Sequence, residues 1–432
     1  MRLVRIVVAT VALASCAPEL PKPRGWVGDQ LASRTGARLR AAGDREFALP
    51  PGVRAGATLT LDAAVATAIW NDAAFQADLA SLGGAQADLA DAVALPNPVA
   101  TLLLPVGTKQ LELTVRQGLG AIWQRPRRIG AARADAARVA ETLVQRGLDL
   151  TRDVEVAYAN ALLAEHLRGM ARDAAAIWAS LLAIAESRGR TGDASRREVE
   201  AARADARSAQ TDVELAAADA ELARDALRAA LGAPPGFALT LDPSPPEPAL
   251  GDVAAWRAAG LASRPDLRAA THAVEGASER AGLERRRIVE LVGIFDMNGA
   301  GVEIGPGLDL PLPIFDQRQG GRMRARAELE QATWTYVAIR RRILREVTDA
   351  HARLARATSA LAAWNAQVLP PRAEAQRLAA RAFELGDESH LAVLEATRAL
   401  VEAQRRAAEL EAERRRAGAE LVRAAGGRPH AK

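Results

Sequence analysis

Residues that commonly carry chemistry are few in this chain of 432 residues. Cys16 is the only cysteine, so no disulfide can form within the chain. No nucleophile and base share a recognisable motif, and the histidines lack the close spacing of metal ligands; they are His166, His272, His351, His390 and His430. The 57 basic and 53 acidic residues are interspersed, which argues against nucleic-acid binding. We therefore expect no enzyme, no metal site and no nucleic-acid partner.

Cys16 is placed for a covalent modification. Arg2 and Arg5 precede an uncharged run over residues 6–14, which is too short to cross a bilayer and is typical of a secretory signal peptide. The run leads into Leu13-Ala14-Ser15-Cys16, which resembles the lipobox of bacterial lipoproteins, where cleavage precedes a cysteine that is then lipidated. An incidental cysteine after an ordinary signal peptide is the alternative. We predict palmitate on Cys16 as the only cofactor-like group, and the absence of aspartate after it favours the outer membrane.

A repeat with an offset of 194 residues marks two sharp turns. The segment Thr191-Gly192-Asp193-Ala194-Ser195 aligns with Leu385-Gly386-Asp387-Glu388-Ser389. The glycines allow the positive φ that such turns need, and Ser195 and Ser389 are suitable N-caps for the helices that follow.

A heptad pattern follows each turn and predicts a coiled-coil helix. The first seam consists of Val199, Ala202, Ala206, Ala209, Val213, Ala216, Ala220, Ala223, Leu227 and Ala230, and the second, offset by 194, of Val393, Ala396, Leu400, Ala403, Ala407, Leu410, Arg414, Ala417, Leu421 and Ala424. Residues 127–188 and 322–383 precede the turns as partner helices, the second interrupted by Pro370 and Pro371. The sequence therefore predicts two long antiparallel helical hairpins.

Two strand pairs are expected upstream of these hairpins, at residues 99–119 and 288–312. The first pair turns at Gly107-Thr108-Lys109, and the second turns at residues 296–301. Strands of about nine to eleven residues with one apolar face are typical of a transmembrane barrel. Four strands are too few to enclose a pore, so several chains must contribute.

The order of these elements, repeated twice, resembles the TolC-like outer membrane factors. Short motifs carry the likeness: Leu95-Pro96-Asn97-Pro98-Val99, Ser263-Arg264-Pro265-Asp266-Leu267, Leu310-Pro311-Leu312-Pro313-Ile314-Phe315 and Val393-Leu394-Glu395-Ala396. Residues 70–98 are most similar to the heavy-metal, CzcC-type branch. The resemblance implies a homotrimer in the bacterial outer membrane with most of its mass in the periplasm. It also implies two partners, a periplasmic adaptor (membrane fusion protein) and an inner-membrane pump of the RND type.

The predicted fold class is thus mainly α with a small β part, in which long coiled-coil hairpins form an α-barrel tube and trimerisation completes a β-barrel. The predicted organisation is a signal peptide (1–15), a lipid-anchored extension (16–58), a first repeat (59–236), a linker (237–252), a second repeat (253–426) and a tail (427–432).

The resemblance also assigns roles to the turns and to two acids. It implies that an adaptor docks at Gly192, Asp193, Ser195, Gly386, Asp387 and Ser389. Glu198 and Glu395 match acidic aperture positions of the family, although Glu198 also completes a capping box with Ser195. The positions of the family's aromatic and basic gate partners fall on Phe383 and Glu388, so its usual tip contacts are not reproduced.

The function expected from these features is a passive, gated conduit of a tripartite efflux system. A type I protein secretion conduit would have the same architecture. A periplasmic coiled-coil lipoprotein without a pore is the structural alternative, which the two strand pairs disfavour.

Overall fold

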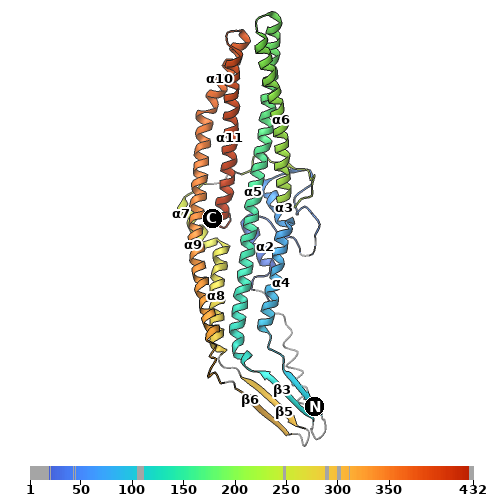
Figure 1. Ribbon diagram of the computed structural model, residues 1–432, viewed down its shortest axis with the longest axis vertical. Coiled ribbons are helices and arrows are strands. Elements are labelled where there is room, and N and C mark those ends of the chain that lie inside the picture. The colour runs from blue at the N-terminus through green and yellow to red at the C-terminus, as the bar shows by residue number, and fades with distance from the viewer. Residues whose placement is uncertain are drawn as a thin grey trace. The chain divides into compact units, whose positions relative to one another are not determined.

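Helices dominate the computed structural model, with short strands in two sheets (Figure 1). The structure describes residues 19, 21–41, 43, 45–104, 111–246, 250–287, 291–298, 303–310 and 312–427, so Cys16 and residues 107–109 lie outside the described residues. The helices are α2 (Arg24–Thr35), α3 (Leu61–Asn71), α4 (Ala73–Val93), α5 (Gly120–Thr191), α6 (Arg196–Ala230), α7 (Val253–Ser263), α8 (Pro265–Arg286), α9 (Gln319–Gln367), α10 (Leu369–Leu385) and α11 (His390–Ala424). The strands are β1 (Thr58–Leu59), β2 (Val99–Leu103), β3 (Glu112–Gly118), β4 (Thr240–Leu241), β5 (Val292–Asn298) and β6 (Glu303–Asp309).

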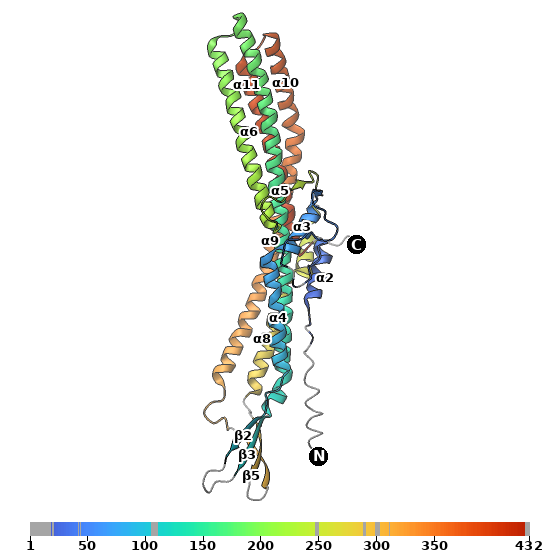
Figure 2. The same ribbon diagram turned by 90° about the vertical axis from the view of Figure 1, so that its right-hand side faces the viewer.

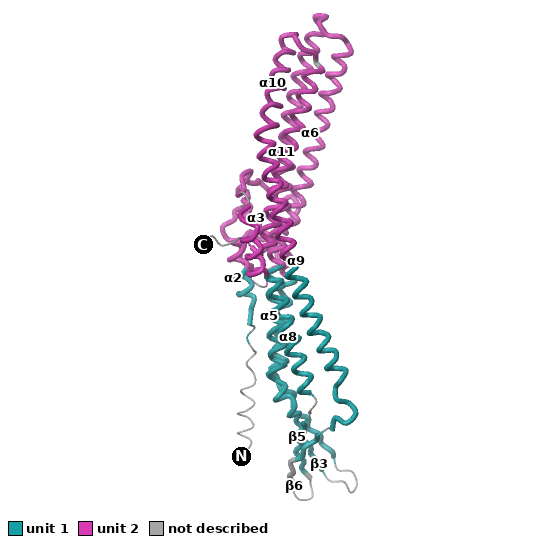
Figure 3. Tube along the Cα trace, turned by 90° about the vertical axis from the view of Figure 1, so that its left-hand side faces the viewer, with its two compact units in different colours: residues 1–30, 77–145, 265–342 teal, residues 31–76, 146–264, 343–432 magenta. Residues whose placement is uncertain are grey.

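The chain forms two compact units, coloured separately in Figure 3. Unit 1 comprises Met1–Gln30, Ala77–Gln145 and Pro265–Arg342, and unit 2 comprises Leu31–Gln76, Arg146–Arg264 and Ile343–Lys432. Each unit takes residues from both predicted repeats, and four helices, α2, α4, α5 and α9, have residues in both units. Among the described residues, no helix combines the length and the apolar character needed to cross a membrane.

Unit 1 contains a four-stranded antiparallel sheet in the order β2-β3-β5-β6. The central pair β3–β5 joins the two predicted strand pairs, with Thr114 opposite Asp296 and Gly118 opposite Val292. Helices α5 and α8 of this unit are linked by ion pairs between Arg127 and Glu279 (3.0 Å) and between Asp135 and Arg280 (2.7 Å). The two strand pairs therefore form one sheet rather than separate hairpins.

The predicted turn at residues 296–301 was wrong at its beginning. Residues 296–298 belong to β5, and the Thr114 hydroxyl donates a hydrogen bond to Asp296 Oδ1 at 2.5 Å. Asp and Asn usually favour turns, but a cross-strand hydrogen bond stabilises Asp296 inside the strand. The described part of the first pair starts at Val99 as expected, and β3 ends at Gly118, one residue before the predicted end.

Unit 2 contains the hairpin of α6 with residues 146–191 of α5 and the hairpin of α11 with α10 and residues 343–367 of α9, and the two run side by side in Figures 1 and 2. All residues of the two heptad seams are buried or half-buried, and Ala202, Ala220, Leu227, Val393 and Leu421 are among the most buried. The exception in the pattern, Arg414, packs its guanidinium against Glu411 at 2.9 Å. The coiled-coil prediction is confirmed.

The prolines interrupt the second hairpin as predicted. Helix α9 ends at Gln367, and Pro370 and Pro371 lie in the first turn of α10. Proline is tolerated there because the first helical N–H groups have no intrahelical acceptor.

Unit 2 also holds an unpredicted parallel pair, β1 with β4. The Tyr158 hydroxyl of α5 lies 2.8 Å from the Leu59 carbonyl oxygen and accepts a hydrogen bond from the Asp242 N–H at 2.9 Å. Burial raises the pKa of Tyr158 to about 12, so it stays neutral. This hydroxyl therefore fixes the strand pair to α5.

Candidate functional site

The first hairpin tip, which we define as residues 191–198, is a polar turn closed by a capping box. Gly192 has φ +85°, and the Asp193 N–H donates to the Arg188 carbonyl oxygen at 2.8 Å, as in a glycine-terminated helix. Ser195 is the N-cap of α6, and its N–H donates to Glu198 Oε2 at 2.7 Å while its hydroxyl accepts from the Glu198 N–H at 3.3 Å. These bonds to the Ser195 backbone and side chain hold the pKa of Glu198 below its usual value. Glu198 is therefore an ionised cap residue.

The second tip, residues 385–392, has the same backbone but a different surface. Gly386 also has φ +85°, and the Asp387 N–H donates to the Ala382 carbonyl oxygen at 3.0 Å. Ser389 caps α11 by accepting from the Ala392 N–H at 3.4 Å. A capping box cannot form because position 392 is alanine. Leu385 and Leu391 flank the turn and are 63% and 58% exposed, so this tip presents two leucines beside its polar turn, which the first tip lacks.

The two hairpins are joined just behind the tips by a small core in unit 2. Trp178 and Leu181 of α5 pack with Phe383 of α10 and Val393 of α11. The Arg188 guanidinium lies over the Phe383 ring, 5.1 Å from its centroid. Such a cation–π contact stabilises by about 0.5–1 kcal/mol at an exposed site. A few turns further on, Arg398 of α11 binds Asp205 of α6 at 3.0 Å. The sequence did not indicate these contacts between the hairpins.

The two candidate gate acids have different surroundings. Glu198 bonds to its own helix cap, whereas the Glu395 side chain is exposed beside the fully buried Val393. No described residue binds the Glu395 carboxylate through an ion pair or a side-chain hydrogen bond. Glu395 is thus the one of the two that remains available to ions or partners. No group of three or more potential metal ligands gathers among the described histidines, aspartates and glutamates.

Comparisons with known proteins agree on one family. Residues 290–427 match the family described as Outer membrane efflux protein. The cobalt-zinc-cadmium resistance protein CzcC of Cupriavidus metallidurans is 26% identical over 364 residues, which cover 80% of this chain and 85% of that protein.

Solved structures share the fold. The outer-membrane channel OprN superimposes with a TM-score of 0.72 at 21% identity, covering 95% of this chain and 99% of OprN. VceC from Vibrio cholerae superimposes with a TM-score of 0.71 at 20% identity, covering 85% of this chain and 96% of VceC. The family match over residues 290–427, the relative that aligns with most of the chain and the shared fold show that this chain is similar to the outer membrane efflux proteins.

Proposed function

We propose that this chain is the outer-membrane channel subunit of an efflux system and that it assembles as a homotrimer. The observation that carries this proposal is the open sheet of unit 1. Among the described strands, β2 and β6 each pair on one side only. Val99, Leu102 and Leu308 on these edge strands are 61%, 56% and 59% exposed. Exposed apolar side chains suit a lipid environment, but unpaired strand edges are stable there only when further strands close the sheet, and other copies of the chain can supply these strands.

In such a trimer, the hairpin tips would bind an adaptor. The tips at Gly192 and Gly386 end long helices, so they are the first parts of unit 2 to meet an adaptor, which in turn binds an RND-type pump. The relative CzcC is named for cobalt, zinc and cadmium resistance, which supports divalent metal ions as the exported substrate. In a trimer, three Glu395 carboxylates would form a ring that attracts cations.

Conductance tests the channel and the gate together. Purified protein in a planar bilayer should give single-channel steps, and divalent cations added on the tip side should block them. Glu395→Gln should weaken this block several-fold because it removes the ring of charges, whereas Glu200→Gln, an exposed acid of α6 that is ion-paired with Arg203 at 3.0 Å, should leave it unchanged. A protein without conductance would instead be the spacer lipoprotein, and an equal block in Glu395→Gln would exclude this residue from the gate.

We also propose that lipid on Cys16 anchors the chain, since dual acylation gives stable membrane attachment where one acyl chain does not. Metabolic labelling with palmitate should mark the wild type and not Cys16→Ser. Equal labelling of the two proteins would contradict the anchor.

A type I secretion conduit remains the rival, because it would share the fold. Loss of the chain should lower resistance to cobalt, zinc and cadmium salts if the proposed substrate is right. A loss of protein export with unchanged metal resistance would favour the rival.

A further inference from the structure

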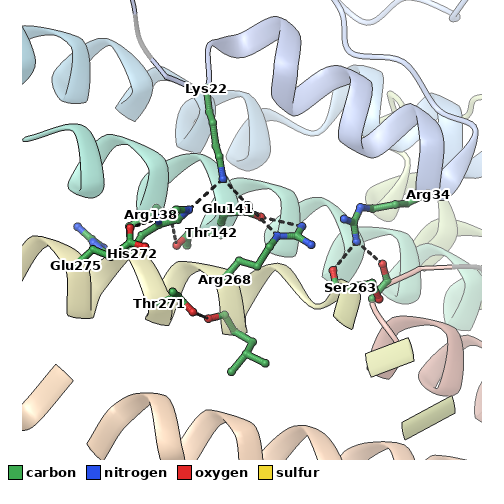
Figure 4. A network of polar contacts seen from close by, with 12 residues as sticks. Lys22, Arg34, Arg138, Glu141, Thr142, Ser263, Arg268, Thr271, His272 and Glu275 are labelled. Atoms are coloured by element: carbon green, nitrogen blue, oxygen red, sulfur yellow. Dashed lines mark hydrogen bonds and ion pairs between the residues drawn. The ribbon is translucent and has the colours of Figure 1, made fainter. Parts of the chain in front are cut away.

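A buried carboxylate in unit 1 has a charged partner from the N-terminal segment. The Glu141 side chain of α5 is only 1% exposed. Arg268 of α8 binds it with two hydrogen bonds, Nε to Oε1 at 2.9 Å and Nη2 to Oε2 at 3.0 Å. Lys22, which precedes α2, adds a third from Nζ to Oε1 at 2.6 Å (Figure 4). Burial raises the pKa of Glu141, but the hydrogen bonds and charges of Arg268 and Lys22 outweigh burial and hold that pKa below its usual value.

Arg268 alone could neutralise Glu141, so the structure would not need Lys22 for charge balance. Lys22 nevertheless has three partners, since its Nζ also lies 3.1 Å from His272 Nε2 and 4.5 Å from the centroid of the Trp26 ring. A compact ammonium can serve partners in several directions, whereas a planar guanidinium favours one carboxylate side-on. The chain has 57 basic residues, of which only Lys22, Lys109 and Lys432 are lysines. One of these three lysines thus occupies position 22, where an ammonium group contacts Glu141, His272 and Trp26 at once.

The contact between Lys22 and His272 requires a neutral imidazole. An ammonium group only donates hydrogen bonds, so Nε2 must accept, and the ring proton then lies on Nδ1, 2.8 Å from Glu275 Oε2. Besides Lys22 and Glu275, the charged groups around this ring are Glu141 and Arg138 of α5 and Arg268 of α8 (Figure 4). Protonation would turn Nε2 into a donor and set a second positive charge against Lys22. Histidine is the side chain whose charge ordinarily changes between pH 5 and 8.

We propose that Glu141, Arg268 and His272 form a docking site for the N-terminal segment, that Lys22 is the group they bind, and that acidification releases it. Lys22 is six positions after Cys16, so a lipid on Cys16 is attached at most about 22 Å from the Lys22 backbone. Glu141 is 21 residues into α5, about 32 Å along the helix from the end next to β3. The largest possible span of about 22 Å is shorter than these 32 Å, so release at Lys22 would lengthen the reach of a lipid on Cys16. This consequence for the anchor rests on the proposed function, whereas the docking itself does not.

Amine modification tests the docking directly because the chain has so few lysines. Purified protein is treated briefly with an acetylating reagent, and mass spectrometry gives the acetylation of Lys22 relative to Lys109 and Lys432. Lys22 should react about tenfold more slowly, the factor expected from one charge-assisted hydrogen bond. Glu141→Gln should bring Lys22 close to the other two lysines. Glu279→Gln is the matched control, since it removes an α5–α8 ion pair that does not contact Lys22.

The pH arm uses the wild type at pH 7.5 and pH 5.5, so it does not depend on the folding of Glu141→Gln. The ratio of Lys22 to Lys432 acetylation should rise several-fold at pH 5.5, while the ratio changes little in His272→Gln, whose amide oxygen still accepts from Lys22 but does not titrate. Equal reactivity of the three lysines in the wild type would overturn the docking site. The same rise at pH 5.5 in His272→Gln as in the wild type would overturn the release. Cys16→Ser should keep Lys22 protected, so loss of the lipid anchor and loss of docking give different results.

Discussion

Gly386→Trp is expected to abolish efflux while the protein still assembles and inserts. A side chain at this position meets nothing within 4 Å, so an indole would project from the tip rather than disturb the hairpin. The φ of +85° adds a backbone cost of about 1–2 kcal/mol for most L residues. Metal resistance of a strain that depends on this chain is the measurement, with membrane fractionation as the check on insertion.

Gly386→Asn distinguishes the effect of side-chain size from the effect of backbone strain, because asparagine tolerates positive φ and has a small side chain. It should retain most of the efflux activity. If Gly386→Trp also retained activity, the second tip would not be a docking surface, and if both variants lost it, the loss would reflect the turn rather than a blocked partner.

Arg264→Met is expected to lower the free energy of unfolding by about 3 kcal/mol, because it removes the charge-assisted hydrogen bonds of a fully buried guanidinium. The Arg264 side chain is fully buried in unit 2, and its Nη1 donates to Glu346 Oε2 at 2.6 Å and to the Ala424 carbonyl oxygen at 3.2 Å. For a chain of this length, the midpoint of thermal unfolding should fall by about 3–6 °C, measured by circular dichroism in detergent.

Arg353→Met is the matched control, because it breaks an ion pair between α9 and α11, the two helices that Arg264 contacts. Arg353 of α9 binds Glu420 of α11 at 3.0 Å, but its side chain is 62% exposed. An exposed ion pair contributes about 0–1 kcal/mol, so its loss should hardly move the midpoint. Equal effects of the two substitutions would mean that burial does not govern the strength of the Arg264 contact.

Local patterns in the sequence predicted the hairpins well. The alternating three- and four-residue spacing from Val199 to Ala230 specifies one buried face without reference to the rest of the chain, and Ser195 and Ser389 cap the helices as expected. The extension of β5 through Asp296 to Asn298 was missed because the hydrogen bond to Asp296 comes from Thr114, 182 residues away. For the same reason no pattern indicated that Lys22 meets Glu141, 119 residues away, or that β1 pairs with β4.

At the tips, the sequence predicted the equivalence of the two turns but not their difference. The offset of 194 aligned Gly192 with Gly386, and both adopt the same φ. Whether a leucine near a turn is buried or exposed depends on the packing around it, and the structure shows that Leu385 and Leu391 are exposed. The Arg188–Phe383 contact likewise needed both hairpins in place.

The difference between the tips has a consequence for stoichiometry. A trimer would present six turns of one backbone shape, but only the three turns at Gly386 would be flanked by exposed leucines. An adaptor that recognises only the turn would fill six equivalent places, whereas one that binds the leucines beside Gly386 would fill three. The number of adaptors bound per trimer therefore shows whether the adaptor recognises the turn itself or the leucines beside Gly386.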